Sequence, residues 1–152
     1  MMGIFNVKMM PARAMYLIDT NIVSELRKAQ SVNRGVIEFM SRVSAAQEHC
    51  YLSVVTVGEL YRGVGMIRHR GDTKQANQLS DWLESILKDY QDRILPIDND
   101  VALIWASLRI PHHENAIDKL IAATALSHSL TLVTRNTKDF GKTGVPMVDP
   151  FT

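Results

Sequence analysis

Apolar positions along this chain fall into short continuous runs that alternate with longer amphipathic segments. The runs have the length of buried strands, and they occupy residues 16–18, 50–55, 93–97, 130–134 and 145–149. Between them, apolar residues recur at spacings of three and four, which predicts helices at residues 21–29, 34–46, 57–69, 79–90, 101–108 and 116–129. Strands that alternate with helices form βαβ units. We therefore expect a three-layer α/β/α fold with a mostly parallel central sheet.

The composition is that of an ordinary globular domain. Hydrophobic residues make up 46% of the 152 residues and charged residues 22%. The lone Cys50 excludes an internal disulfide, and no apolar run approaches the roughly 20 residues that cross a bilayer. The segment 1–14 carries four methionines and Pro11 without periodicity or a signal-peptide pattern. We expect it to be a disordered leader or a mis-assigned start, followed by one cytoplasmic domain at residues 15–152.

The net charge of +1 excludes a global basic field of the kind found in proteins that coat nucleic acid. Any contact with nucleic acid must therefore be local.

Acidic side chains follow the predicted strands or begin the helices after them. The positions are Asp19, Glu59, Asp118 and the pair Asn136 and Asp139. Ligands of open parallel sheets bind beyond the carboxyl ends of the strands, so we expect these side chains to converge there. Clustered carboxylates repel one another unless a cation neutralises them, and hard oxygen ligands suit Mg²⁺ or Mn²⁺.

Each acid also has a purely structural explanation. These explanations are helix capping by Asp19 or Asn21, a capping box of Thr56 and Glu59, an interaction of Asp118 with the helix dipole, and an Asx turn at Asn136–Asp139. No zinc site is expected, because Cys50 is alone and the histidines of "HHEN" (112–115) are spaced too closely for a zinc-protease helix. We expect His112 and His113 in a solvated loop.

Four segments together resemble the PIN-domain ribonucleases, and in particular the VapC toxins of bacterial toxin–antitoxin pairs, including their FitB-like branch. In chain order they are "YLIDTNIVSEL", "YLSVVTVGELYRG", "AIDKLIAATAL" and "LTLVTRNTKDF", and the resemblance covers residues 15–150. One departure is the connection at residues 109–118, which is shorter than the Gly-containing connection of many relatives. It affects substrate contacts at that edge of the site.

The resemblance implies roles for individual residues. Asp19 matches the first acid of the family pattern, Glu59 the acid of its "T-x-x-E-L" helix, and Asp118 the third acid. The family pattern places its fourth acid at the position of either Asn136 or Asp139, and Asp139 is the better carboxylate candidate because Asn136 is neutral. The resemblance implies that Asp19, Asp118 and Glu59 hold Mg²⁺ or Mn²⁺. It also implies that Thr20, Asn21 and Asn136 orient these acids without binding the metal themselves.

Basic residues near the acids are candidates for contacts with RNA phosphates. They are Arg62, Lys119 and Arg135, and the alternative is a solvated helix face or ion pairs with the acids. The apolar stripe from Leu79 to Tyr90 is expected to belong to the core, and the alternative is a homodimer or antitoxin surface.

The function implied by the resemblance is that of a metal-dependent endoribonuclease toxin, in which a metal-activated water hydrolyses RNA phosphodiesters. The implied partners are a small cognate antitoxin and a second copy of the chain, with DNA contacted only through the antitoxin. The alternative is a PIN-fold regulatory module that acts through its antitoxin and DNA with little or no cleavage. A receiver-like phospho-acceptor would need two adjacent acids after the first strand, whereas "LIDTN" has one.

Overall fold

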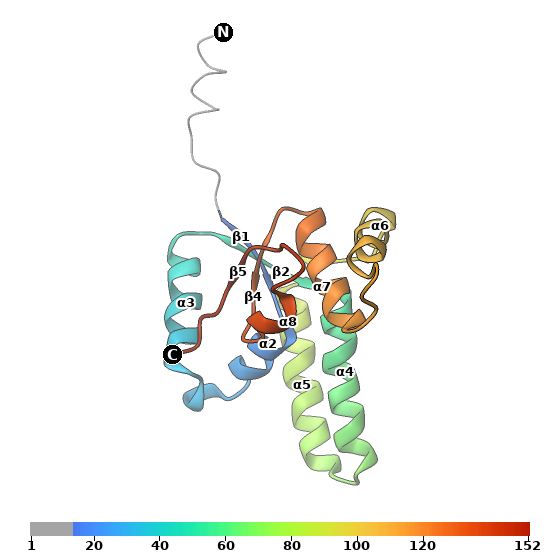
Figure 1. Ribbon diagram of the computed structural model, residues 1–152. Coiled ribbons are helices and arrows are strands. Elements are labelled where there is room, and N and C mark those ends of the chain that lie inside the picture. The colour runs from blue at the N-terminus through green and yellow to red at the C-terminus, as the bar shows by residue number, and fades with distance from the viewer. Residues whose placement is uncertain (1–13) are drawn as a thin grey trace.

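The computed structural model describes residues 14–152 (Figure 1). Its strands are β1 (Met15–Ile18), β2 (His49–Ser53), β3 (Ile94–Leu95), β4 (Thr131–Val133) and β5 (Met147–Val148). Its helices are α2 (Thr20–Leu26), the 3-10 turn η1 (Ala29–Ser31), α3 (Arg34–Ala45), α4 (Val54–His69), α5 (Thr73–Asp89), α6 (Asn99–Leu108), α7 (Ala116–Ser127) and α8 (Thr137–Phe140). Residues 1–13, on which the prediction of a leader falls, lie outside the described part.

The strands form one sheet in the order β3-β2-β1-β4-β5, and every neighbouring pair is parallel. The predicted parallel α/β architecture is therefore confirmed. β1 lies at the centre, where Tyr16 pairs with Cys50 of β2 on one side and with Thr131 of β4 on the other. Because the chain crosses to opposite sides of β1, the carboxyl ends of β1 and β4 form the switch point at which ligands of such sheets bind.

Alternate residues of β1 supply the two layers of the core. Ile18 is fully buried with Ile22 of α2 and Phe39 of α3, against which Trp82 of α5 also packs. Leu17 is fully buried on the opposite face, in a cluster that includes Ile121 of α7. Each such burial contributes about 1.5–3 kcal/mol, so the central strand is held from both sides and its carboxyl end is fixed in place.

Several predicted boundaries differ from the structure, and three of these differences are instructive. The second strand ends at Ser53 rather than at Val55, because the Ser53 hydroxyl accepts a hydrogen bond from the Val55 amide (3.1 Å) and caps α4. The capping box expected at Thr56 and Glu59 is therefore wrong, since both residues lie inside α4. The first helix ends at Leu26, and α5 begins at Thr73, well before the apolar stripe that predicted it.

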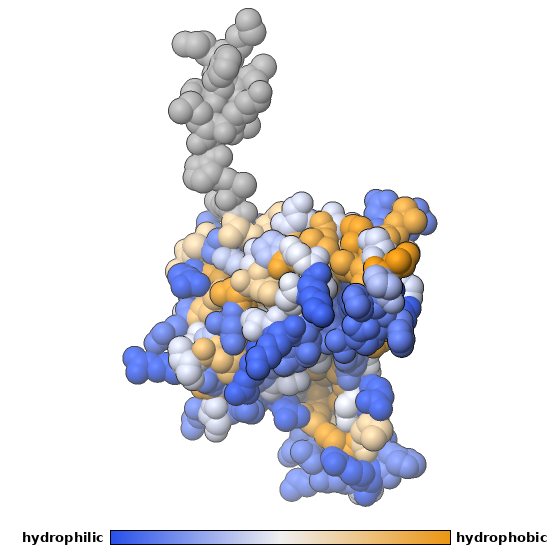
Figure 2. All heavy atoms as spheres, viewed as in Figure 1, coloured by the Kyte–Doolittle hydropathy of each residue, from blue (hydrophilic) through white to orange (hydrophobic). Residues whose placement is uncertain are grey.

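The helices α4 and α5 pack side by side and extend beyond the sheet (Figure 1). Figure 2 shows hydrophilic residues over most of the far end of this hairpin. In the stripe from Leu79 to Tyr90, Leu83 is buried, while Trp82, Ile86 and Tyr90 are partly buried against the core. These four residues of the stripe therefore belong to the core or pack against it, whereas Leu79 lines a cavity at the surface. No helix within residues 14–152 is both long and apolar enough to cross a membrane.

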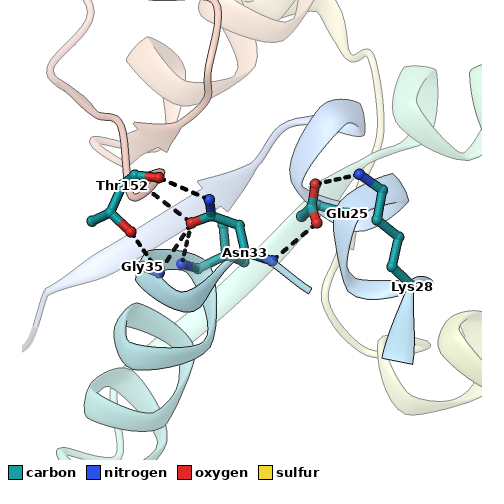
Figure 3. Close-up of polar contacts among 6 residues, drawn as sticks. Glu25, Lys28, Asn33, Gly35 and Thr152 are labelled. Carbon is teal, nitrogen blue, oxygen red and sulfur yellow. Dashed lines mark hydrogen bonds and ion pairs between the residues drawn. The ribbon is translucent and has the colours of Figure 1, made fainter. Parts of the chain in front are cut away.

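The C-terminal residues are fastened to the start of α3 (Figure 3). Asn33 accepts a hydrogen bond from the Thr152 amide (3.1 Å) and donates one to the Thr152 carbonyl (3.0 Å). The Gly35 amide donates to Asn33 Oδ1 (3.0 Å) and to the Thr152 hydroxyl (3.1 Å). A Cβ atom at Gly35 would lie 2.1 Å from the Pro150 carbonyl oxygen, so only glycine permits this close approach. We call this contact the C-terminal clasp.

Candidate active site

The first predicted acid, Asp19, lies directly beyond the central strand. Its backbone amide still belongs to the sheet, because it donates to the carbonyl of Val133 in β4 (3.0 Å). Its side chain is 4% exposed. A carboxyl group buried this deeply needs hydrogen-bond partners.

Three donors supply them. Asp19 Oδ1 accepts from the Thr20 amide (2.8 Å), which makes Asp19 the N-cap of α2. Asp19 Oδ2 accepts from the Thr134 hydroxyl (2.8 Å) and from Asn21 Nδ2 (3.2 Å). Burial raises the pKa of Asp19 and the negative charge of Glu59 adds to this rise, while the three hydrogen bonds oppose it. The carboxylate is thus fixed in orientation at the mouth of the sheet.

Glu59 approaches Asp19 from α4. Its Oε1 accepts a hydrogen bond from the Thr20 hydroxyl (2.8 Å), and the hydroxyl of Thr56 lies 3.3 Å from that of Thr20. Since Thr20 also donates its amide to Asp19, this residue connects the first two acids.

Asp118 lies in the first turn of α7, which follows Asn115 in a left-handed conformation (φ 56°). The pKa of Asp118 is raised to about 6, first by burial and then by the negative charges of Asp19, Asp139 and Glu59. The other three predicted acids therefore act electrostatically on the carboxyl group of Asp118, so the structure brings all four together.

Asp139 is exposed in the short helix α8, directly after the end of β4. The expected Asx turn is not formed, because the Asn136 side chain makes no capping hydrogen bond. Asn136 instead donates its backbone amide to the Thr134 hydroxyl (3.0 Å), which in turn donates to Asp19. Asn136 is therefore linked to Asp19 through its main-chain amide and the Thr134 hydroxyl, and not through its side chain.

The three basic candidates differ in their surroundings. Arg62 is exposed on α4, and Arg135 is exposed with its guanidinium 4.5 Å from the ring centre of Phe151. Lys119 is 7% exposed, and its Nζ donates to the His112 carbonyl (2.6 Å). Within residues 14–152 none of the three forms an ion pair with the acids, and a solvated helix face stays the alternative for the exposed Arg62 and Arg135.

The acids fit a divalent metal ion by their chemistry, although they are not arranged as a preformed site. Within the part of the chain that the structure describes, no three His, Cys, Asp or Glu side chains are arranged as a preformed metal site. The chemistry of the donors nevertheless fits a hard divalent cation, because all are carboxylates and no Lys or Arg of residues 14–152 neutralises them. His112 and His113 are exposed in the loop before α7, as predicted, and zinc ligation by a histidine pair has no support.

The sequence did not predict the roles of two threonine hydroxyl groups in this site. Thr134 is fully buried and donates to Asp19, and Thr56 is fully buried beside Thr20. For Thr134 the signal was its place at the carboxyl end of the strand next to β1, since a side chain there must face the first acid. Thr56 carried no such signal, because its position depends on where α4 begins.

Comparison with known proteins bears directly on this arrangement. Residues 16–145 match the PIN domain family. The chain belongs to the PIN-domain family. This PIN domain is 40% identical over 143 residues to Toxin FitB of Neisseria gonorrhoeae, an alignment that covers 90% of this chain and 99% of that protein. It is 32% identical to VapC ribonuclease Y4jK of Sinorhizobium fredii, over 90% of this chain and 98% of that protein.

A solved structure leads to the same family. The structure of FitAB bound to an IR36 DNA fragment superposes on this PIN domain with a TM-score of 0.76 at 35% identity, over 91% of this chain and 96% of that chain. The resemblance to PIN domains of the FitB and VapC type and the predicted fold are thereby confirmed.

Proposed function

We propose that this PIN domain is the toxin of a toxin–antitoxin pair and a Mg²⁺- or Mn²⁺-dependent endoribonuclease. The observation that carries the proposal is the partly buried carboxyl of Asp118, whose pKa is raised by burial and three other acids at the mouth of the sheet. The mutual repulsion of such a cluster destabilises the fold unless a cation neutralises it. The names of two relatives, Toxin FitB and VapC ribonuclease Y4jK, agree with it.

In this function Asp19 and Asp118 are the principal metal ligands, and Glu59 and Asp139 complete the acidic pocket. A bound divalent ion would polarise the scissile phosphate and lower the pKa of the attacking water. The orientation of the Asp19 carboxylate is fixed, because Thr134 and Asn21 donate hydrogen bonds to its Oδ2. Thr20 holds Glu59 beside it.

Local positive charges are proposed to hold the RNA, since the net charge of +1 provides no general attraction. Arg62 and Arg135 are exposed and free of carboxylate partners within residues 14–152, so they are available to phosphates. Lys119 is the third candidate, and it differs from the two arginines because it is buried.

The proposed partners follow from the toxin assignment. A small cognate antitoxin would block the acids, and a cavity of about 130 Å³ beside Glu59, lined by Leu60 and Trp82, offers an apolar contact for it. DNA would be reached only through that antitoxin, as the DNA-bound FitAB complex suggests. The half-exposed Tyr61 and Ile117 are candidates for a homodimer surface. The proposed compartment is the cytoplasm.

The test is incubation of the purified chain with total RNA in Mg²⁺, in Mn²⁺ and in EDTA, followed by mapping of the cut ends. We expect cleavage with either metal and none with EDTA. Asp19→Asn and Asp118→Asn should each abolish cleavage while the circular dichroism spectrum is retained. Full activity of either variant would contradict the assignment, and a folded chain that cuts no RNA would favour the regulatory alternative.

A further inference from the structure

A second cavity opens beside the acids, and apart from Asp139 and Lys119 its residues have no role in the function proposed above. It has a volume of about 360 Å³ and lies between the connection before α7 and the segment that contains α8. Asp139 is part of its wall, so the cavity borders the acidic cluster. Its volume is within the range of pockets that bind small organic ligands.

The wall contains a buried cation. Lys119 is 7% exposed, and the only hydrogen bond of its Nζ within residues 14–152 is to the His112 carbonyl (2.6 Å). No carboxylate oxygen in that part of the chain lies within 4.0 Å of Nζ. Glu114, on the same wall, is influenced by the positive charge of Lys119 but forms no ion pair with it. A buried ammonium without an ion pair is costly, which indicates that the cavity receives an anion.

The other groups of the wall specify the kind of anion. Lys138 and Lys142 are exposed at the same cavity and add two further positive charges. Glu114 is also on the wall, but it is exposed and its nearest basic group is His112 Nδ1 (3.8 Å). Leu108 and Ile110 supply apolar surface. Positive charge for a phosphate next to apolar surface for a base is the combination that recognises a nucleotide.

We propose that this cavity binds the nucleotide next to the scissile bond of the RNA, with its phosphate on Lys119, Lys138 and Lys142 and its nucleoside against Leu108 and Ile110. The proposal rests on the proposed ribonuclease function, which it deepens by assigning a subsite. It also gives a role to the short connection at residues 109–118, whose residues form one side of the cavity. The nucleoside part of the subsite would therefore contribute to the choice of cleavage site.

The first test measures binding without cleavage. The full chain is titrated in EDTA with each of the four nucleoside 5′-monophosphates and with inorganic phosphate, and amide shifts are followed by NMR. We expect shifts at residues 108–119 and 138–143, and tighter binding of at least one nucleotide than of phosphate. The double variant Lys138→Ala/Lys142→Ala should weaken that binding by roughly tenfold or more, because it removes two charge-assisted contacts.

The matched control is Lys74→Ala/Lys88→Ala, which removes two exposed lysines of α5 and should leave the affinity unchanged. Lys119→Met should abolish binding, and the exposed double variant keeps the test valid if Lys119→Met fails to fold. Shifts that are absent, or equal in the two double variants, would overturn the subsite. Equal affinity for inorganic phosphate and every nucleotide would overturn its nucleoside part.

A second measurement separates this proposal from the proposed function. On an RNA that is cleaved with Mg²⁺, Lys138→Ala/Lys142→Ala should raise KM about tenfold and change kcat by less than twofold. A chain that binds nucleotides in this cavity and cleaves no RNA would leave the subsite standing and overturn the ribonuclease assignment. An active chain whose KM and cut sites are unaffected by the variant would overturn the subsite alone.

Discussion

At the scale of single residues, Asp19 shows that a capping role and a chemical role are compatible. In the sequence these were alternative explanations of the same acid. In the structure Oδ1 caps α2 through the Thr20 amide, while Oδ2 is oriented by Thr134 and Asn21. Because the carboxylate has two oxygens, the hydrogen bond that caps α2 uses only one of them. The same bond also fixes the orientation of the carboxylate, as a metal ligand requires.

Thr134 provides the most direct test of this orientation. Thr134→Val preserves the shape of the side chain and removes the hydroxyl that donates to Asp19 (2.8 Å). This hydrogen bond holds the pKa of Asp19 down, so its removal should raise that pKa further above the ordinary value of a carboxyl group. We expect the acidic limb of the pH–rate profile to move to higher pH. Thr131→Val, in the same strand, is the control, and identical profiles for the two variants would refute the role of Thr134.

Asp118 makes the stability of the metal-free protein depend on pH. Its pKa is about 6 in the folded chain and near 4 in an unfolded one, so the folded state binds the extra proton between these values. The free energy of unfolding should therefore fall as the pH rises from about 4 to 6 and stay low above that. After allowance for solvent screening the loss is about 1–2 kcal/mol.

The measurement is urea unfolding in EDTA at pH 4 and pH 7.5. Asp118→Asn should be more stable than the parent chain at pH 7.5 and similar to it at pH 4. Mg²⁺ should stabilise the parent chain and have little effect on the variant. A variant that is less stable at pH 7.5 would show that the acids do not repel one another as the structure indicates.

At the scale of elements, the sequence predicted the strands and helices well where the hydrophobic period was long, and less well at their joins. The start of α4 was misplaced because Val54 and Val55 are as apolar as the strand before them, and only the Ser53 cap marks the change. The burial of Lys119 was not predictable either, since it depends on the path of the loop that supplies the His112 carbonyl. The proximity of the acids was predictable, because Asp19 and Asp139 follow strand ends of a parallel sheet and the family pattern indicated Glu59 and Asp118.

The C-terminal clasp predicts a contrast between two glycines. Gly35→Ala would place a methyl group 2.1 Å from the Pro150 carbonyl oxygen and should destabilise the protein by about 2 kcal/mol or more. Gly65→Ala, in the exposed part of α4, meets no atom within 4 Å and should stabilise it by up to about 1 kcal/mol. Chemical denaturation of both variants measures the difference. Equal effects would mean that the tail does not hold the start of α3.

At the scale of the whole molecule, charge is organised locally within a nearly neutral chain. Acids occupy the centre of the sheet edge, and lysines line the cavity next to them. Although the net charge is only +1, an acidic region and a basic region therefore lie next to each other. RNA should be held by few contacts close to the scissile bond and weakly elsewhere.

This arrangement predicts a shallow dependence of RNA affinity on salt. For about three phosphate contacts, the slope of log K against log salt should be about −2 for a single strand. Fluorescence anisotropy of a labelled oligonucleotide in EDTA measures it, and Lys138→Ala/Lys142→Ala should reduce the slope by up to about 0.7, because the two lysines hold one phosphate. A slope steeper than about −4 would instead indicate a long basic track across the surface.

The capping bond of Asp19 has a genetic consequence. Asparagine caps helices as well as aspartate does, so Asp19→Asn removes the charge while α2 keeps its N-cap. Aspartate and asparagine codons differ by a single base. A toxin of this design therefore lies one transition from a silent, folded form that still occupies its antitoxin. When the gene is expressed without its antitoxin, surviving colonies should be enriched in this missense allele relative to other changes at the same codon.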